Sequence, residues 1–320
     1  MNYNPILIVA GEPNSIFSEI FFKVIKKKKF KNSIILITSK KLLSLQMKKL
    51  KLKKEIRLIN HLNLKKQKID NKKINLVNID FNQKKAFSKI SLKSNQFIEN
   101  SFKVAFKIIK QNNIHKFING PISKKTFLNK KFLGITEYIA KKFKVKKNCM
   151  LIYNKNLSVC PITTHLPLKL VSKKINKKTI TEKIFLINNF YKKNFNKIPR
   201  IAILGLNPHC ESVDKFNEDE KIIKPCVKSL SKKYNVSGPY SADTIFLKNN
   251  RKKFDVIVGM YHDQVLTPFK TLYEYDAINI TLGLPFTRIS PDHGPNEKML
   301  GKNSSNPLSL LKAIQFLDKN

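Results

Sequence analysis

The chain has 320 residues, a formal net charge of +42 and an apolar fraction of 42%. This length suffices for one large domain or two closely packed ones, and the short apolar runs exclude a disordered chain. No stretch approaches the roughly 18 consecutive apolar residues of a membrane span, and no charged leader precedes the first apolar run. The four cysteines form no CxxC pair, which is typical of free thiols. We therefore expect a globular protein of the reducing cytoplasm with no membrane partner.

The positive charge is unevenly distributed. Residues 1–200 contain 47 Lys and Arg against 8 Asp and Glu, whereas residues 201–320 contain 16 against 13. Nearly all of the excess is lysine, although the planar guanidinium of arginine is the better group for recognising phosphates and bases. We interpret the charge as lysine enrichment of solvated surfaces and expect no specific nucleic-acid partner. A basic nucleic-acid-binding protein is the more distant alternative.

Short apolar segments alternate with longer, lysine-rich amphipathic ones, which is typical of an α/β protein with a largely parallel sheet. The predicted strands are 5–10, 33–38, 56–60, 74–78, 116–119, 149–154, 157–162, 200–205, 255–259 and 277–281. The predicted helices are 15–28, 94–112, 136–143, 179–194, 217–232, 241–250 and 304–318. The chain has only nine glycines, almost all at predicted strand ends or turns, and we expect the functional site there.

Three histidines each follow a predicted strand: His165 in TTHLPL, His209 in GLNPHC and His262 in MYHDQ. Neutral imidazoles from distant parts of a chain can hold a catalytic divalent cation and leave one coordination position open. Isolated histidines that make loop hydrogen bonds are the alternative, and for any single residue this is the commoner case. His61 and His115 lie in Lys- and Asn-rich surroundings and are left outside the candidate site.

Two carboxylates accompany these histidines. Asp263 directly follows His262, and Asp243 lies in SADT at the start of a predicted helix. Either could orient a metal ligand, neutralise the cation or transfer a proton, so both are candidate catalytic residues. For Asp243 the alternative is a helix N-cap, and the two roles are compatible.

Three further residues are candidates for an anion-binding site. Lys270, Asn279 and Arg288 are spaced so that they could converge on a phosphate or carboxylate at the ends of adjacent strands. Arg288 is the most informative of them, because arginine occurs at only four positions and this one lies in the unusual segment NITLGLPFTRISPDHG. A surface ion pair is the alternative for this arginine.

An ordered set of motifs resembles the 4-hydroxythreonine-4-phosphate dehydrogenase family of pyridoxal phosphate biosynthesis. The match extends from Gly11 almost to the C-terminus, and the motif spacing is more specific than any one motif. The motifs are GPI (120–122), GxTEY (134–138), TTHLPL (163–168), GLNPH (205–209), ADT (242–244), MYHDQ (260–264), NITLGLPF (279–286) and DHG (292–294).

The resemblance implies a three-layer α/β/α fold similar to that of isocitrate and isopropylmalate dehydrogenases, with two subdomains and a cleft between them. The first subdomain is expected to comprise 1–128 and 276–320. The second, 129–275, is expected to carry the metal ligands and the dimer contacts. The resemblance further implies a homodimer whose active site lies at the subunit interface. The chain has no GxGxxG motif, so NAD would be bound by other loops.

The resemblance also implies residue roles. His165, His209 and His262 would be ligands of a divalent metal, Zn or alternatively Mg, Mn or Co. Thr136, Lys270, Asn279 and Arg288 would contact the phosphorylated substrate, although the residues alone indicate an N-cap for Thr136. The cofactor would lie near Asp292, His293 and Gly294. The implied reaction is the NAD-dependent oxidation and decarboxylation of 4-phosphooxy-L-threonine, which is 4-hydroxythreonine 4-phosphate, to 3-amino-2-oxopropyl phosphate.

The chain departs from the family pattern at three places. The Gly-rich opening GDPxGIGPE is GEPNSIFSE here, with Glu12 in place of aspartate, and DHG is followed by PNEK. The family's GHTE is GITE, so Ile135 replaces a histidine that contacts the substrate. A sister dehydrogenase that acts on another four-carbon 4-phosphate, of the threonate or erythronate type, is therefore the nearer alternative.

Overall fold

The computed structural model describes residues 4–128, 132, 134–214, 216–291 and 293–319. The chain forms two compact units: unit 1 comprises Met1–Tyr138 with Pro285–Asn320, and unit 2 comprises Ile139–Leu284. The first division falls within helix α4 (Ile135–Lys142). The boundaries predicted from the sequence were 128/129 and 275/276.

The described residues of unit 1 form six parallel strands in the order β3-β4-β2-β1-β5-β12. Their core members are almost entirely apolar and buried, as expected for parallel strands that are covered on both faces. The strands are β1 (Ile6–Val9), β2 (Ile34–Thr38), β3 (Ile56–Leu58), β4 (Ile74–Asn78), β5 (Lys116–Asn119) and β12 (Thr287–Pro291).

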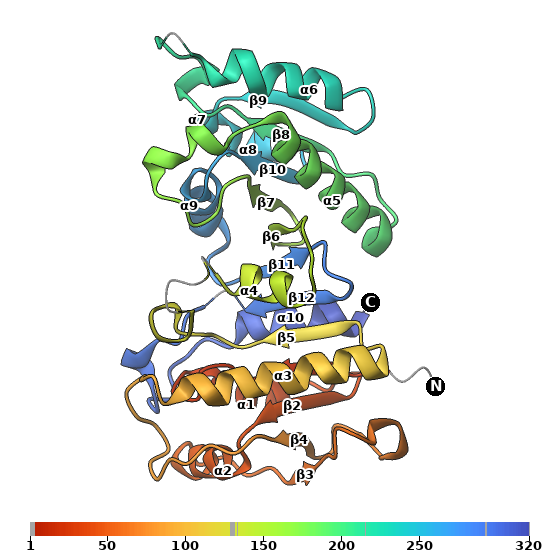
Figure 1. Ribbon diagram of the computed structural model, residues 1–320, viewed down its shortest axis with the longest axis vertical. Coiled ribbons are helices and arrows are strands. Elements are labelled where there is room, and N and C mark those ends of the chain that lie inside the picture. The colour runs from red at the N-terminus through yellow and green to blue at the C-terminus, as the bar shows by residue number, and fades with distance from the viewer. Residues whose placement is uncertain (1–3, 129–131, 133, 215, 292, 320) are drawn as a thin grey trace. The chain divides into compact units, whose positions relative to one another are not determined.

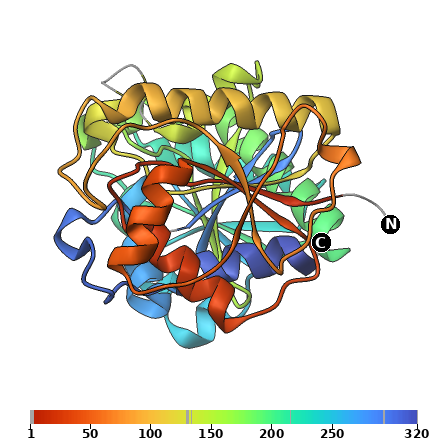
Figure 2. The same ribbon diagram turned by 90° about the horizontal axis from the view of Figure 1, so that it is seen from below.

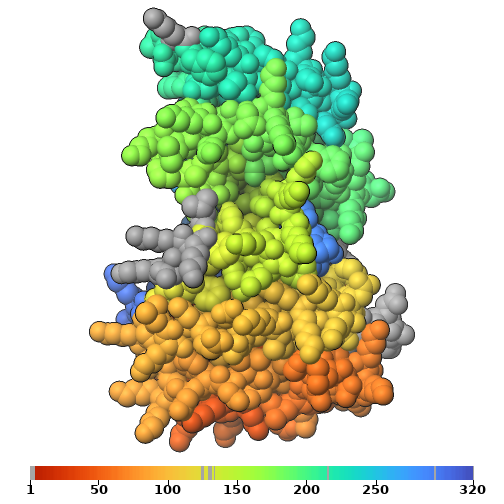
Figure 3. All heavy atoms as spheres, viewed as in Figure 1, coloured from red at the N-terminus to blue at the C-terminus, as the bar shows by residue number. Residues whose placement is uncertain are grey.

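Helices cover both faces of this sheet. Seen along the layers, α3 lies on one face, and α1 and α10 lie on the other (Figure 2). In the space-filling view, α3 and the segment before it, in yellow and orange, form much of the visible surface of unit 1 (Figure 3). The helices are α1 (Phe17–Lys27), α2 (Lys40–Lys49), α3 (Ser94–Asn112) and α10 (Leu308–Lys319), with short helical turns at Leu64–Lys66, Lys124–Leu128 and Glu297–Met299.

In the described part of unit 2, six strands lie in the order β11-β6-β7-β10-β8-β9 (Figure 1). The β11-β6 and β6-β7 pairs are antiparallel, and the remaining neighbours are parallel. The strands are β6 (Cys149–Tyr153), β7 (Ser158–Pro161), β8 (Ile201–Leu204), β9 (Val236–Tyr240), β10 (Val256–Gly259) and β11 (Ile278–Leu282).

The helices of unit 2 pack on its sheet through alternate strand residues. Ile152, Val159 and Ile257 form a buried cluster with Val265 and Phe269 of α9, while α5 contacts β6 and β11. The helices are α5 (Lys177–Phe195), α6 (Lys224–Leu230), α7 (Ala242–Ile245), α8 (Lys248–Arg251) and α9 (His262–Tyr273), with short helical turns at Leu168–Leu170, Ser172–Lys174, Pro208–Cys210 and Asp219–Ile223. None of the helices in the described part of the chain combines the length and the apolar character that crossing a bilayer requires.

The mixed α/β architecture that the sequence predicted is confirmed, and all ten predicted strands are present within a few residues. Two strands were missed. Strand β9 contains Gly238 and Pro239, which usually argue against a strand, and β12 contains Arg288 and ends at Pro291. Helices α2 and α9 were also missed; Pro268 lies inside α9, where it normally ends a helix. The predicted helix 241–250 is two short helices.

Candidate active site

The three candidate metal ligands follow three neighbouring parallel strands of unit 2. Strand β10 pairs with β7 on one side and with β8 on the other. His165 follows β7, His262 is the first residue of α9 after β10, and His209 lies in the turn Pro208–Cys210 after β8. Since the carboxyl ends of parallel strands meet at one edge of a sheet, all three leave the sheet at the same edge, where α/β proteins bind ligands.

His165 and His262 are brought into contact. Their ring centroids are 5.8 Å apart, with 37° between the ring planes. The ladder between β7 and β10 continues past the strand ends, because the Thr163 amide donates to the Met260 carbonyl (3.1 Å) and the Thr163 hydroxyl donates to the same oxygen (2.8 Å). His262 Nδ1 lies 2.6 Å from Asp263 Oδ1, and the role of Asp263 in orienting a metal ligand stays a prediction.

The loop that carries His209 is held by a carboxylate that the sequence did not single out. Asp219 is 1% exposed, and it accepts hydrogen bonds from the amides of Leu206 (2.7 Å) and Asn207 (3.0 Å). Gln264, at the start of α9, accepts from the Met260 amide and donates to the Gly205 carbonyl, both at 2.7 Å. Gln264 therefore joins the end of β8 to the end of β10. The MYHDQ motif contained this residue, whereas nothing in the sequence distinguished Asp219.

Imidazole nitrogen is a preferred ligand of zinc and related divalent cations, so the donor type fits a metal. The positions of the three histidines fit a metal site only in part. Among the described residues, no three His, Cys, Asp or Glu side chains lie close enough together to hold an ion. One chain therefore brings two of the three expected ligands together, and His209 lies on an exposed loop.

Asp243 is exposed and is the second residue of α7, which has Ser241 as its N-cap residue. The interpretation of Asp243 as an N-cap is therefore wrong, because the helix begins at Ala242, two residues earlier than that role requires. The carboxylate lies near the His209 loop: burial chiefly raises the pKa of the Cys210 thiol, and the charges of Asp219 and Asp243 raise it further.

Lys270 and Asn279 both belong to unit 2 but lie on different kinds of element. Lys270 is on α9 rather than at a strand end, so the predicted strand-end position is wrong for this residue; it follows His262 by about two helical turns. Burial lowers its pKa. Asn279 lies on β11, and its buried Oδ1 has no hydrogen-bond partner among the described residues. A buried amide oxygen without a partner is suited to receive a ligand.

Arg288 and Thr136, both in unit 1, are in direct contact. Arg288 is fully buried on β12, and its Nη1 donates to the Thr136 hydroxyl at 3.1 Å. Its Nε donates to Oδ1 of Asn119, at the end of β5, at 2.7 Å. Thr136 is in the first turn of α4, which begins at Ile135, so it is not the N-cap. The alternative of a surface ion pair for Arg288 is wrong, because no part of the side chain is exposed.

The structure describes two of the three residues predicted to lie near the cofactor, His293 and Gly294. Asp292 lies outside the described residues. The Nδ1 atom of His293 is 3.1 Å from the Gly294 carbonyl, and a Cβ atom built on Gly294 would meet nothing within 4 Å. The space beside Gly294 is therefore open among the described residues, and its role in cofactor binding stays a prediction. We assign no described residue of this region to NAD on structural grounds.

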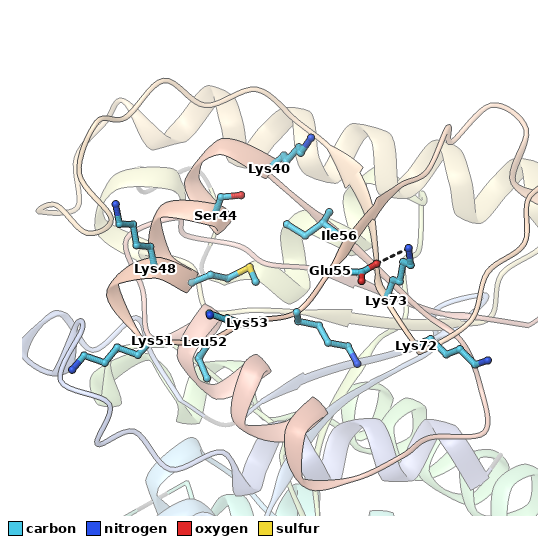
Figure 4. Close-up of a pocket in the computed structure, with 12 residues that line it drawn as sticks. Lys40, Ser44, Lys48, Lys51, Leu52, Lys53, Glu55, Ile56, Lys72 and Lys73 are labelled. Carbon is cyan, nitrogen blue, oxygen red and sulfur yellow. Dashed lines mark ion pairs between the residues drawn. The ribbon is translucent and has the colours of Figure 1, made fainter.

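Two surface cavities of unit 1, of about 1160 and 590 Å³, adjoin each other and share Lys54, Lys72 and Lys73. None of the predicted site residues lines either of them. In the larger one, lysines surround a short apolar floor, and Glu55 pairs with Lys73 at 2.5 Å (Figure 4). Its lining residues are Lys40, Ser44, Met47, Lys48, Lys51, Leu52, Lys53, Lys54, Glu55, Ile56, Lys72 and Lys73.

Comparison with known proteins places the chain in a family. The family model of the pyridoxal phosphate biosynthetic protein PdxA matches residues 30–317. A 4-hydroxythreonine-4-phosphate dehydrogenase of Sulfurihydrogenibium sp. is 38% identical over 318 residues, which cover 97% of this chain and 96% of that protein. A D-threonate 4-phosphate dehydrogenase of Pectobacterium atrosepticum is 33% identical over 207 residues, covering 63% and 64% of the two chains.

Solved structures agree with these relatives. The crystal structure of 4-hydroxythreonine-4-phosphate dehydrogenase from Klebsiella pneumoniae superposes with a TM-score of 0.83 at 25% identity, over 98% of each chain. Isocitrate dehydrogenase from Methylococcus capsulatus superposes with a TM-score of 0.51 at 9% identity, over 99% of this chain and 85% of that one. The second likeness concerns the fold alone, and it confirms the predicted fold class.

Proposed function

The chain belongs to the PdxA family of pyridoxal phosphate biosynthetic proteins, and from this premise we propose that it is a 4-hydroxythreonine-4-phosphate dehydrogenase. The observation that carries the proposal is the exit of His165, His209 and His262 from three neighbouring parallel strands at one edge of the sheet. Three imidazoles at such an edge suit a metal-assisted oxidoreductase better than a structural role.

The proposed reaction has two steps. In the first, the hydride on the carbinol carbon passes to NAD+ and the hydroxyl proton passes to a base, which leaves a ketone. In the second, the carbon–carbon bond to the carboxylate breaks and CO2 leaves. The electron pair passes to the ketone oxygen, and reprotonation of carbon gives 3-amino-2-oxopropyl phosphate. Asp243 and Asp263 are the candidate proton-transfer groups, since both accompany the histidines and both are exposed to incoming substrate.

Thr136, Lys270, Asn279 and Arg288 are the proposed contacts of the anionic substrate. In unit 1, the buried guanidinium of Arg288 supplies a fixed positive charge and donates to the Thr136 hydroxyl. In unit 2, Lys270 supplies a second charge, and Asn279 offers a buried amide oxygen for the substrate amine. Such fixed contacts hold the carbinol C–H toward the cofactor.

We further propose that His165, His209 and His262 hold a divalent metal, with zinc as the first choice and Mg, Mn or Co as alternatives. A cation there supplies electrostatic stabilisation of negative charge on the substrate oxygens. Since one chain brings only His165 and His262 together, His209 of a second copy would complete the ligand set. Asp263 orients the His262 ring through Nδ1.

A homodimer follows from the same argument. Exposed apolar side chains accompany each histidine: Leu168 follows His165, Val213 and Phe216 follow His209, and Leu272 is on the helix of His262. Apolar groups gathered near a polar site mark surfaces that a partner covers. We therefore propose that unit 2 carries the dimer contacts. We also propose that the enzyme works in the cytoplasm, where its four free cysteines would stay reduced.

A dehydrogenase of another four-carbon 4-phosphate is the second candidate, and Ile135 in place of the family histidine favours it. The test is the formation of NADH from 4-phosphooxy-L-threonine, measured after chelation and after restoration of each divalent metal. The proposal predicts turnover that chelation removes and metal restores. Replacement of His115, an exposed histidine outside the site, by Ala provides the matched control for His165→Ala. Full activity of a metal-stripped enzyme would contradict the metal, and inertness toward this substrate would contradict the assignment.

A further inference from the structure

Cys149 and Cys160 place their sulfur atoms 3.1 Å apart inside unit 2. Cys149 is the first residue of β6, and Cys160 lies on β7. Both are free cysteines, and both side chains are 0% exposed. Each sulfur also lies near the carbonyl oxygen of the next residue, at 3.8 and 3.7 Å, which is long for a hydrogen bond. A disulfide bond is about 2.05 Å long, so an approach of about 1 Å would join the two sulfurs.

The pairing of the two strands brings these thiols together on one face of the sheet. Strands β6 and β7 are antiparallel neighbours that pair Ile152 with Val159. One residue further along this register, Cys160 comes opposite Leu151. Cys149 points to the same side as Leu151, because side chains alternate along a strand. Ile152 and Val159 point to the other face, where they pack in the cluster that includes α9. The sulfur contact is therefore fixed by two strands of the core.

The surroundings of the two thiols differ. Cys149 follows Asn148, which is partly exposed and whose carbonyl accepts from Lys183 Nζ of α5 at 3.4 Å. The hydrogen bond between the sulfurs chiefly lowers the pKa of Cys149 and raises that of Cys160, while burial opposes the first shift and adds to the second. The Lys183 ammonium also lowers the pKa of Cys149. Cys149 is therefore the better nucleophile of the pair, and it adjoins a residue that reaches solvent.

We propose that Cys149 and Cys160 form a modification site, at which Cys149 attacks a hydroperoxide and Cys160 then closes a disulfide that small thiols reduce again. Since neither sulfur is exposed, the oxidant reaches Cys149 when this end of β6 opens locally. Disulfides of cytoplasmic proteins are usually transient in this way, and the resting protein keeps its thiols free. The site lies within unit 2 and does not depend on the proposed function.

The chemistry has two steps. In the first, the Cys149 thiolate attacks one oxygen of the peroxide, an S–O bond forms and the O–O bond breaks. The second oxygen leaves and takes up the thiol proton as water, which leaves a sulfenic acid. In the second step, the Cys160 sulfur attacks the Cys149 sulfur, the S–S bond forms and the S–O bond breaks. The Cys160 proton leaves with the hydroxyl as a second water. Two thiols are oxidised and one peroxide is reduced.

Tryptic cleavage makes this disulfide directly observable, because Lys155 lies between the two cysteines. The native chain is treated with hydrogen peroxide, unfolded in a thiol-alkylating reagent, digested and analysed by mass spectrometry. We expect peptides 148–155 and 156–169 to be joined. Reduction by dithiothreitol before alkylation should separate them and leave both cysteines alkylated. Full alkylation of both peptides without reduction would overturn the proposal, as would a stable sulfinic acid at Cys149 in place of the joined peptides.

Cys226 is the matched control within the same sample. It is 2% exposed, but its Sγ contacts the Thr181 hydroxyl at 3.9 Å rather than a second sulfur. We expect Cys226 to lose its ability to be alkylated roughly tenfold more slowly than Cys149, or slower still. Equal rates would show that the thiols are oxidised through general unfolding, and would overturn the proposal.

Cys160→Ser tests the order of attack, because serine keeps a hydroxyl that can donate to the Cys149 sulfur. Without the second sulfur, Cys149 should stop at the sulfenic acid, which dimedone labels on peptide 148–155. Cys149→Ser should leave Cys160 unlabelled. The Tm of each variant before oxidation shows whether it is folded, and Cys160→Ala replaces Cys160→Ser if it is not. A label on Cys160 in Cys149→Ser, with none on Cys149 in the folded Cys160 variant, would overturn the proposal.

Discussion

His165 and His262 place their imidazole rings 5.8 Å apart, although one follows a strand and the other begins a helix far along the chain. The contact exists because β7 and β10 are parallel neighbours in a register that pairs Pro161 with Gly259. His209 leaves β8, on the other side of β10, and in the described part of the chain it does not join them in a cluster of three ligands. The two neighbouring rings therefore form a pair that one chain contributes as a unit.

This arrangement predicts which inactive variants complement each other. If a second copy supplies His209, co-expression of His209→Ala with His165→Ala gives mixed dimers in which one site has all its ligands. We expect activity of roughly a quarter of the wild-type value, since about half of the dimers are mixed and each has one intact site. The pair His165→Ala with His262→Ala should stay inactive, because every site then lacks a ligand. Recovery by this second pair, or by neither pair, would contradict the assignment.

The contacts of Asp219 lead us to predict that its replacement weakens metal binding. Asp219→Ala would leave the buried amides of Leu206 and Asn207 without acceptors, at a cost of about 1–3 kcal/mol each in stability, and would loosen the His209 loop. We expect the concentration of metal that gives half-maximal activity to rise about 10- to 100-fold, with kcat largely recovered at saturating metal. Asp255→Ala is the control: this carboxylate pairs with Lys197 and Arg200 at the start of β10 and should affect Tm alone. An unchanged metal requirement in Asp219→Ala would count against a positioning role.

Local sequence determines much of this fold but little of the support around the site. Runs such as IIL and VIV predict buried strands wherever they occur, and the histidines that follow such runs are visible as a set. Helix α9 was not predicted, because Pro268 argues against a helix. Without this helix, the sequence did not reveal that His262 and Lys270 belong to one element. The surrounding chain overrides that local preference by packing Val265 and Phe269 into the core.

The contacts of Asp219 and Asn119 were invisible for a different reason. Asn119 meets Arg288 only because β5 and β12, distant in sequence, are paired in a register that places Arg288 opposite Phe117. Asp219 reaches the end of β8 from a separate turn. No periodicity or motif encodes such pairings, because they depend on strand order rather than on local composition.

Glu12, which replaces the family's aspartate, predicts a pH effect on stability. Burial raises its pKa, although hydrogen bonds from Ser94 and the Asn14 amide partly oppose the shift. The folded protein then binds more protons than the unfolded chain between the ordinary pKa of glutamate and the raised value, so this carboxyl lowers stability as pH rises through that window. Glu12→Gln keeps an oxygen for both hydrogen bonds. We expect it to raise Tm at pH 7.5 and to leave Tm unchanged near pH 4; a lower Tm at pH 7.5 would contradict the argument.

We predict that nucleic acid binds to this protein according to its total positive charge, and not specifically at the lysine-rich cavities. Four Lys→Gln changes in the larger cavity and four elsewhere on the surface should weaken RNA binding equally, and each set should reduce the salt slope by roughly three. The two sets are Lys48, Lys51, Lys53 and Lys72 against Lys155, Lys193, Lys232 and Lys253. Measurements by fluorescence anisotropy from low to physiological salt give the comparison. A loss confined to the first set would instead identify the cavity as a polyanion site.

Ile135 predicts how substrate choice differs from that of the family. It is the first residue of α4, beside Thr136, and an imidazole here would add a donor next to the Arg288 contact. A hydrogen bond to a charged group contributes about 1.5–3 kcal/mol, so its uncompensated loss would weaken substrate binding roughly ten- to a hundredfold.

Compensation is available at the same place. The first-turn amides of α4 have no intrahelical acceptors and point toward the space before the helix, where an anion is favoured. We therefore expect the native enzyme to use 4-phosphooxy-L-threonine and Ile135→His to change its KM only modestly, by less than about tenfold. Ile135→Val is the control, since it alters bulk without adding a donor. The measurement is kcat/KM for this substrate against threonate and erythronate 4-phosphates in all three proteins. A native enzyme that is inert toward 4-phosphooxy-L-threonine but active on a sugar-acid phosphate would show that Ile135 marks a change of substrate.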